Sequence, residues 1–197
     1  MDLSTLTDQE VVARAAKGHE GAYRELIGRY ERPVFSLVYR LVRDRAAAED
    51  IAQESFIKVL NALDRYDPRF KLSSWIFKIA NNTAIDHLRK KELDTVSLDG
   101  SPHARSVAEA AETWTPSVAS EEESPEEYVE RRELGQELER ALGQLRPEYR
   151  TAIVLWHMED RPYEEIAEIM DIPLGTVKTY IHRARKQLRA ILDHSRV

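Results

Sequence analysis

The sequence predicts an all-α protein, built as two small helical domains joined by a flexible acidic linker. Apolar residues recur at the 3.6-residue spacing of amphipathic helices up to residue 91, and again from residue 131. Between these stretches the apolar period disappears, and Ser, Thr, Pro and Glu accumulate. The chain of 197 residues is 42% hydrophobic with 7 Gly and 8 Pro, which excludes a collagen-like or wholly disordered protein.

The charge is unevenly distributed along the chain, although its net value is −6. Residues 1–91 hold 16 Lys and Arg against 13 Asp and Glu, whereas residues 92–130 hold Arg105 against 11 acidic residues. Residues 131–197 return to near balance, with 12 basic and 11 acidic residues. Because a segment so poor in apolar residues cannot bury enough surface to order itself, we expect residues 92–130 to be a tether. A second interpretation is that its carboxylates screen basic faces of the free protein.

The composition excludes several classes of protein. The chain has no cysteine, which excludes a disulfide scaffold, a thiol nucleophile and thiolate metal sites. The N-terminus lacks the pattern of a secretory signal, and no apolar run approaches the roughly 18 residues that span a bilayer. The six histidines lack paired metal-ligand spacing, and no Gly-rich phosphate loop is present. We therefore expect a cytoplasmic protein without stable membrane insertion, catalytic residues, metal or cofactor.

The first domain is predicted to be helical throughout. Apolar residues from Leu26 to Leu41 follow a helical period, which Pro33 interrupts or kinks. A second helix, from about Ala46 to Leu63, turns small and apolar residues toward the core. Its opposite face combines two carboxylates, an amide and an apolar residue at i, i+3, i+4 and i+7: Asp50, Gln53, Glu54 and Ile57. This face is either an ordinary solvated surface or a docking surface for a basic partner helix.

Residues 66–91 combine a loop, aromatic rings and a basic helix, which Ser73 or Ser74 is expected to cap. Cations bind phosphates, exposed carboxamides read base edges, and aromatic rings hold unstacked bases. The candidate nucleic-acid contacts are Phe70, Trp75, Lys78, Asn81, Asn82, Arg89, Lys90 and Lys91, of which we expect the cations and carboxamides on the exposed side. Taken alone, Trp75 and Phe77 are better explained as core residues, because aromatic residues at helical spacing are usually buried.

The second domain ends in a predicted helix-turn-helix. Pro147 starts a helix, and after it a short helix, a turn at Asp171 to Pro173 and a longer basic helix follow. The polar face of the longer helix carries the candidate contacts Thr176, Lys178, Thr179, Tyr180, Arg183, Arg185 and Lys186. Such a helix is suited to enter the major groove of DNA. A membrane-surface or partner-binding helix is the alternative, which the preceding short helix and turn disfavour.

Three stretches of sequence together carry a resemblance to a known family. They are AEDIAQESFIKVL, SSWIFKIANNTAIDHLRKK and GTVKTYIHRARKQL, and they occur in the expected order and spacing. The chain resembles the bacterial sigma-70 family, and within it the extracytoplasmic-function (ECF) group, which has only domains two and four. The resemblance covers about residues 20–91 and 131–192. It implies domain two over residues 1–91, an acidic linker over 92–130 and domain four over 131–197.

The resemblance also implies partners and roles. Asp50, Gln53 and Glu54 would dock on the clamp helices of the largest subunit of core RNA polymerase, with the beta and beta-prime subunits as partners. The Phe70 to Lys91 segment would melt and read the minus-ten element of promoter DNA, with Asn82 matching the base-contacting asparagine of the family. The helix from about Thr176 would read the minus-thirty-five element as duplex, and an anti-sigma factor would regulate the protein.

Two residues depart from the family pattern. Tyr180 stands where many relatives carry Arg, and Pro173 stands where a capping Ser is frequent. These differences affect the expected minus-thirty-five sequence. Two other functions compete with that of a sigma factor: a stand-alone helix-turn-helix regulator that binds duplex DNA without polymerase, and a helical adaptor that binds only protein.

Overall fold

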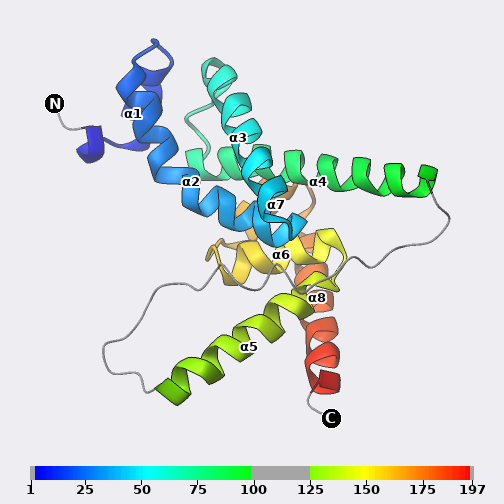
Figure 1. The fold of residues 1–197 in the computed structure, drawn as a ribbon. Helices are drawn as coiled ribbons and strands as arrows, with labels where there is room; N and C mark the ends of the chain where they lie inside the picture. The colour runs from blue at the N-terminus through cyan, green and yellow to red at the C-terminus, as the bar shows by residue number, and fades with distance from the viewer. Residues whose placement is uncertain (1–2, 99–124, 196–197) are drawn as a thin grey trace.

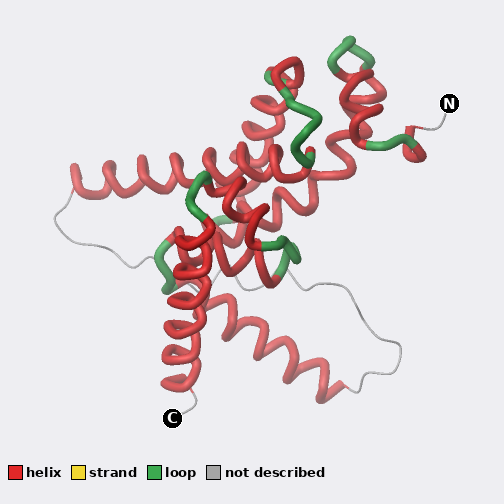
Figure 2. The backbone as a smooth tube through the Cα atoms, turned by 180° about the vertical axis from the view of Figure 1, so that it is seen from behind, coloured by secondary structure: helices red, strands yellow, loops and turns green. Residues whose placement is uncertain are grey.

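The described part of the chain is helical. The computed structural model describes residues 3–98 and 125–195, and each regular element in these two stretches is a helix (Figures 1 and 2). The first stretch contains η1 (Leu3–Thr5), α1 (Asp8–Ala15), α2 (Glu20–Val42), α3 (Arg45–Asn61), η2 (Leu63–Arg65) and α4 (Leu72–Leu98). The second contains α5 (Pro125–Gly143), α6 (Pro147–His157), α7 (Tyr163–Met170) and α8 (Leu174–Ser195). The prediction of an all-α protein is confirmed.

The first domain is a bundle in which α2 packs against α1, α3 and α4. A capping box begins α1, because the Thr7 side chain accepts a bond from the Glu10 backbone and the Glu10 carboxylate accepts one from the Thr7 backbone. Helix α2 continues through Pro33, so the proline does not end it. Leu26 and Leu37 of this helix are fully buried, and they form part of the core between α2 and its neighbours.

Helices α3 and α4 begin with different local chemistry. The Asp44 side chain caps α3 by accepting a bond from the Ala47 backbone at 3.0 Å. Helix α4 begins at Leu72, so Ser73 and Ser74 lie in its first turn and the prediction that one of them caps the helix is wrong. The Ser74 hydroxyl instead donates to Glu165 of α7, and the Ser73 hydroxyl accepts from Arg161, which precedes α7.

The second domain contains the expected helix-turn-helix. Pro147 is the first residue of α6, where its fixed φ and missing N–H are well tolerated. Helix α7 ends at Met170, Asp171 takes a left-handed conformation with φ 56°, and α8 follows from Leu174. The apolar face of α8 packs on α6 and α7, and Val177 lies on its buried side. The predicted turn and the predicted start of α6 are therefore confirmed.

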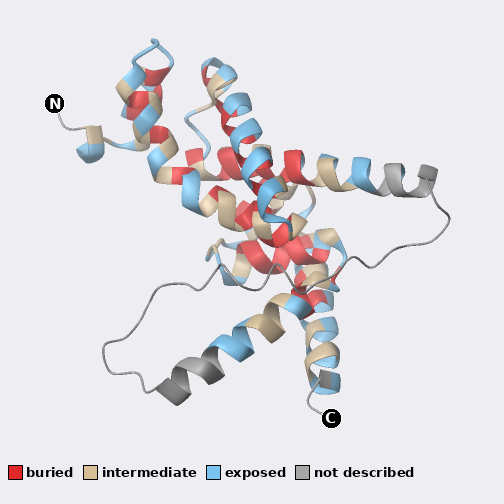
Figure 3. Ribbon diagram, viewed as in Figure 1, coloured by how far each residue is buried: buried red, intermediate tan, exposed pale blue. Residues whose placement is uncertain are grey.

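The two domains pack on each other. Helix α7 lies against α4, α5 and α6 lie against α2, and the buried side chains of both domains form one apolar cluster (Figure 3). Arg150 of α6 joins the domains, since its buried guanidinium donates to the Leu41 carbonyl of α2 at 2.6 Å. It also donates to three carbonyls at the end of α5 and after it, those of Leu142, Gly143 and Leu145. Burial lowers the pKa of Arg150 to about 10, so at neutral pH a cation lies at the C-terminal ends of two helices, where it is favourable.

The acidic segment is described only at its ends. Helix α4 extends to Leu98 and α5 begins at Pro125, so helical structure continues into both ends of the segment 92–130. Residues 99–124 lie outside the described residues, and the tether, its screening role and the domain limits stay predictions. Among the described residues, no helix is long and apolar enough to cross a bilayer. In the same residues, no group of His, Asp and Glu is arranged to hold a metal ion.

Candidate docking and nucleic-acid interfaces

The outer face of α3 is open to solvent. Asp50, Gln53, Glu54 and Ile57 are all exposed, and Ile57 keeps 58% of its surface accessible. Lys58 lies 2.7 Å from the Glu54 carboxylate, and its hydrogen bond lowers the pKa of Glu54, which stays ionised at neutral pH. We call the four residues from Asp50 to Ile57 the docking face. It is a negative surface with one apolar side chain, which suits a basic amphipathic helix.

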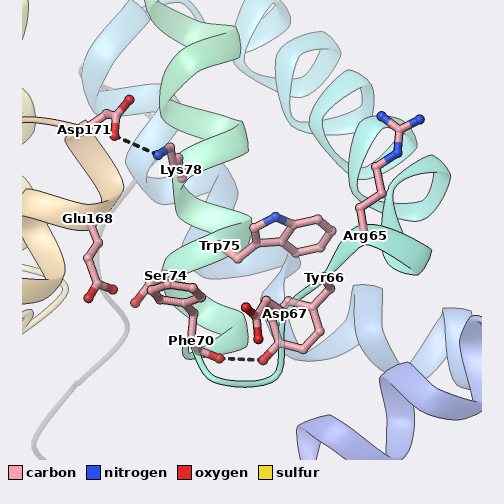
Figure 4. A pocket seen from close by; sticks show the side chains of 9 residues that line it. All are labelled: Arg65, Tyr66, Asp67, Phe70, Ser74, Trp75, Lys78, Glu168 and Asp171. Atoms are coloured by element: carbon pink, nitrogen blue, oxygen red, sulfur yellow. Dashed lines mark hydrogen bonds and ion pairs between the residues drawn. The ribbon is translucent and has the colours of Figure 1, made fainter.

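A pocket of about 420 Å³ opens at the loop before α4, and we call it the aromatic pocket (Figure 4). Tyr66, Phe70 and Trp75 line it, and the ring centres of Tyr66 and Trp75 are 5.3 Å apart. The Tyr66 hydroxyl donates to the Phe70 carbonyl at 2.7 Å, and the Asp67 carboxylate accepts from the Arg69 backbone at 3.0 Å. These bonds fix the loop, while half of the Phe70 surface stays exposed and available to stack on a planar ligand.

The second domain forms one side of the aromatic pocket. Glu168 of α7 and Asp171 after it line the pocket together with Ser74 and Lys78 of α4. Lys78 donates to the Asp171 carboxylate at 3.0 Å, the pair marked in Figure 4. The pocket therefore combines aromatic surface from the first domain with carboxylates from the second.

The carboxamides of α4 differ in exposure. Asn82 is exposed, but Asn81 is buried, and the Thr151 hydroxyl of α6 lies 3.3 Å from its side-chain oxygen. The expectation of an exposed Asn81 is wrong, because the second domain covers it. Phe77 is fully buried, as expected for a core ring, and Trp75 is half-buried at the pocket. Farther along α4, the exposed cations are Arg89, Lys90 and Lys91.

Helix α8 presents the predicted polar face, and α6 fixes part of it. The exposed members are Lys178, Thr179, Arg183, Arg185 and Lys186, whereas Thr176 and Tyr180 are half-buried. The Tyr180 ring packs on Tyr149 of α6 with ring centres 5.2 Å apart. Arg183 donates to the Tyr149 hydroxyl at 3.1 Å, which raises the pKa of Arg183. The guanidinium of Arg185 lies 4.5 Å from the ring centre of Trp156. Several predicted contact residues are thus oriented by α6.

The sequence did not identify two residues of these surfaces. Tyr66 supplies a wall of the aromatic pocket, and its position directly before the Asp-Pro turn of a basic segment was a usable signal. Lys71 forms an ion pair with Glu165, which lies 94 residues farther along the chain. No local sequence pattern predicts an ion pair between residues so far apart in the chain, because each residue belongs to a different domain.

Two sequence families match the two domains. Residues 26–93 match Sigma-70 region 2, and residues 135–188 match Sigma-70, region 4. The ECF RNA polymerase sigma-E factor of Escherichia coli K12 is 38% identical over 183 residues, 93% of each chain. The ECF RNA polymerase sigma factor SigW of Bacillus subtilis is 35% identical over 178 residues, 90% of this chain and 92% of that protein.

Two solved structures are similar in fold. The sigma factor RpoE from Bartonella quintana, in complex with the anti-sigma factor NepR, has a TM-score of 0.69 at 23% identity. The match covers 87% of this chain and 96% of that one. CnrH, in complex with the cytosolic domain of CnrY, has a TM-score of 0.66 at 22% identity and covers 95% and 97% of the two chains.

Proposed function

Because the chain belongs to the sigma-70 family, as a member of its ECF group, we propose that three of its surfaces divide promoter recognition between them. The protein is an RNA polymerase sigma factor. Sigma factors direct the initiation of transcription and are not enzymes, so the roles assigned below are binding roles. Domain two occupies residues 1–91 and domain four residues 131–197, with the acidic segment as their tether.

The docking face of α3 binds core RNA polymerase. Its partner is a basic helix, as in the clamp of the beta-prime subunit, and the beta subunit completes the interface with the rest of the chain. Exposed Ile57 beside the carboxylates of Asp50 and Glu54 supports this role. Burial of the apolar side chain favours binding, and the surrounding charges orient the partner and exclude acidic surfaces.

The aromatic pocket holds a base of the minus-ten element after that base leaves the duplex. The observation that carries this proposal is the meeting of Tyr66, Phe70 and Trp75 at the start of a basic helix. Stacking of a base on an aromatic ring stabilises binding by about 1–3 kcal/mol, and this energy is gained only when the strands have opened. Asn82 and the cations of α4 then contact the neighbouring bases and phosphates.

Helix α8 reads the minus-thirty-five element as duplex. Its exposed face is suited to the major groove, where Arg183 and Lys186 bind phosphates or guanine edges. Tyr180 packs on Tyr149 and contacts a phosphate or a thymine methyl group from that fixed position. Binding of α8 to the duplex places the first domain beside the segment of promoter DNA whose strands separate.

An anti-sigma factor regulates the protein. The sigma factor RpoE from Bartonella quintana is in complex with the anti-sigma factor NepR, and this similarity in fold supports the proposal. A partner of this kind covers the docking face, the nucleic-acid surfaces or both.

Run-off transcription with purified core polymerase, followed by mapping of transcript starts, tests the proposed function. We expect initiation at starts that share a minus-ten and a minus-thirty-five element. A stand-alone regulator would instead protect promoter duplex without polymerase and leave transcription by the core enzyme unchanged. Failure of the folded protein to direct any initiation would contradict the proposal.

A further inference from the structure

A buried tyrosine of α6 contacts one of the proposed DNA ligands of α8. Tyr149 keeps 7% of its surface accessible and belongs to the apolar cluster, while its hydroxyl reaches Arg183. Two neighbours fix its place: Pro147 starts α6, and Arg150 donates to four backbone carbonyls. Because a tyrosine side chain has only two torsions and this ring is buried, its hydroxyl is an acceptor at a fixed position.

The hydrogen bond to this tyrosine orients Arg183 and leaves part of its guanidinium for a ligand. Arg183 donates from Nη1 to the Tyr149 hydroxyl at 3.1 Å. The residue is exposed, so without this bond its long side chain would sample several rotamers. The edge formed by Nε and Nη2 is not used in the bond, and such an edge matches two oxygens of a phosphate. The tyrosine therefore restricts the cation without occupying its binding edge.

The partners of Arg183 and Arg185 differ in charge from those of other surface arginines. Several arginines pair with a carboxylate within four residues along the chain: Arg24, Arg45, Arg69, Arg89 and Arg189. Arg183 contacts the hydroxyl of Tyr149, and the guanidinium of Arg185 lies 4.5 Å from the ring centre of Trp156. A carboxylate partner cancels much of the charge that attracts a phosphate, whereas an aromatic partner orients the cation and leaves its charge for DNA.

A ring contact gives Tyr149 a second attachment to α8. The rings of Tyr149 and Tyr180 lie 5.2 Å apart between centres, with their planes tilted by 57°. Tyr180 precedes Arg183 by three residues, so both lie on the same side of α8. The ring of Tyr149 therefore packs on α8 while its hydroxyl holds the cation. These two contacts can be separated, because phenylalanine retains the ring and lacks the hydroxyl.

We propose that Tyr149 is a positioning residue for minus-thirty-five DNA: its hydroxyl holds the Arg183 guanidinium where that group binds a phosphate of the duplex. The proposal rests on the proposed function of α8 and adds a residue that lies outside this helix. Tyr149 acts through Arg183, since it is itself buried. Because Arg183 is ordered before the duplex arrives, less side-chain entropy is lost on binding.

The substitution Tyr149→Phe tests this role, because it removes the hydroxyl and keeps the ring that packs on Tyr180. The measurement is the affinity of the holoenzyme, formed from the chain and core polymerase, for a labelled duplex with the mapped minus-thirty-five sequence. We expect binding about two- to threefold weaker than for the unmodified protein. In a chain that already carries Arg183→Ala, Tyr149→Phe should cause no further loss.

The variant Lys186→Ala provides the matched background. Lys186 is another exposed cation of α8, and here the losses caused by Tyr149→Phe and Lys186→Ala should multiply. A merely structural contribution of Tyr149 would weaken binding by the same factor in the Arg183→Ala and Lys186→Ala backgrounds. That result would overturn the proposal, and so would an unchanged affinity when Tyr149→Phe is the only substitution.

The single variants separate this proposal from the proposed function. If the unmodified holoenzyme binds the mapped duplex no better than a scrambled one, the proposed function of α8 fails. If Arg183→Ala binds like the unmodified protein, the assignment of Arg183 to DNA fails, and the positioning role fails with it. If Arg183→Ala weakens binding but Tyr149→Phe does not, only the positioning role is wrong.

Discussion

Helices α3 and α4 lie side by side in the first domain but differ in how open their functional surfaces are. The docking face of α3 is exposed, including its apolar residue Ile57. On α4 the second domain buries Asn81 and pairs Lys78 with Asp171. The second domain therefore restricts access to part of the proposed minus-ten surface and leaves the docking face open. Substitutions on α3 and substitutions on α4 can therefore measure the strength of the two interfaces separately.

Charge reversal on the docking face has the largest expected effect and tests the exposed surface of α3. Asp50→Arg with Glu54→Arg sets two cations against a basic partner, and like charges at an interface cost several kcal/mol. We expect the affinity for core polymerase to fall by about a hundredfold or more, measured by titration with a labelled chain. Glu31→Arg on the exposed side of α2 is the control and should bind normally. Similar affinities of both proteins would place the polymerase interface elsewhere.

Removal of one pocket ring probes the α4 side of the comparison. Phe70→Ala deletes a ring that we propose to stack on an unpaired base, and because the ring is half-exposed the fold is little affected. We expect the holoenzyme to bind a labelled single-stranded minus-ten oligonucleotide about tenfold more weakly, with unchanged binding of minus-thirty-five duplex. Leu93→Ala, which removes a more exposed apolar side chain of α4 outside the pocket, should have no effect. Loss in both variants would argue against a pocket that recognises a base.

Each cation of α8 should contribute less to binding than the docking face or the pocket ring does. We expect Arg183→Ala and Lys186→Ala each to weaken binding to minus-thirty-five duplex about two- to fivefold. Each should also reduce the slope of log affinity against log salt concentration by the amount expected for about one lost phosphate contact. Arg32→Ala, which removes an exposed cation of the first domain, is the control. Titration of duplex at several salt concentrations measures both quantities, and an unchanged slope would exclude phosphate contacts at these residues.

Acid should open the contact between α7 and α4 only at low pH. Burial raises the pKa of Glu165, but Lys71 and Arg161 bring it below its ordinary value of 4.5. A carboxylate with a lowered pKa in the folded state stabilises the closed arrangement above its ordinary pKa, and this stabilisation is lost as the pH falls through the lower value. We expect energy transfer between dyes placed at Lys17→Cys and Gln144→Cys, two exposed positions in different domains, to stay constant above about pH 5 and to fall below it. The Glu165→Gln protein should lack this component, and an identical pH profile in both proteins would contradict the assignment.

The sequence predicts much of the fold because helical periods are local. The two faces of α3 follow from residue spacing alone, and the turn at Asp171 and the start of α6 at Pro147 follow from local chemistry. The state of Asn81 does not, since its cover is Thr151, which lies 70 residues farther along the chain. From the sequence, the polar side of α4 is predicted to be exposed, because periodicity shows which side of a helix faces away from the core of its own domain. Periodicity does not show which side of the helix is covered by another domain.

Binding of the minus-ten oligonucleotide by the free chain and by the holoenzyme, in one titration with core polymerase, tests the difference between α3 and α4 most directly. We expect the anisotropy of the labelled oligonucleotide to stay low with the free chain and to rise as polymerase approaches one equivalent. Equally tight binding by the free chain would contradict the idea that the cover over Asn81 and Lys78 restricts DNA binding, and absence of binding by the holoenzyme would contradict the assignment of this surface to DNA.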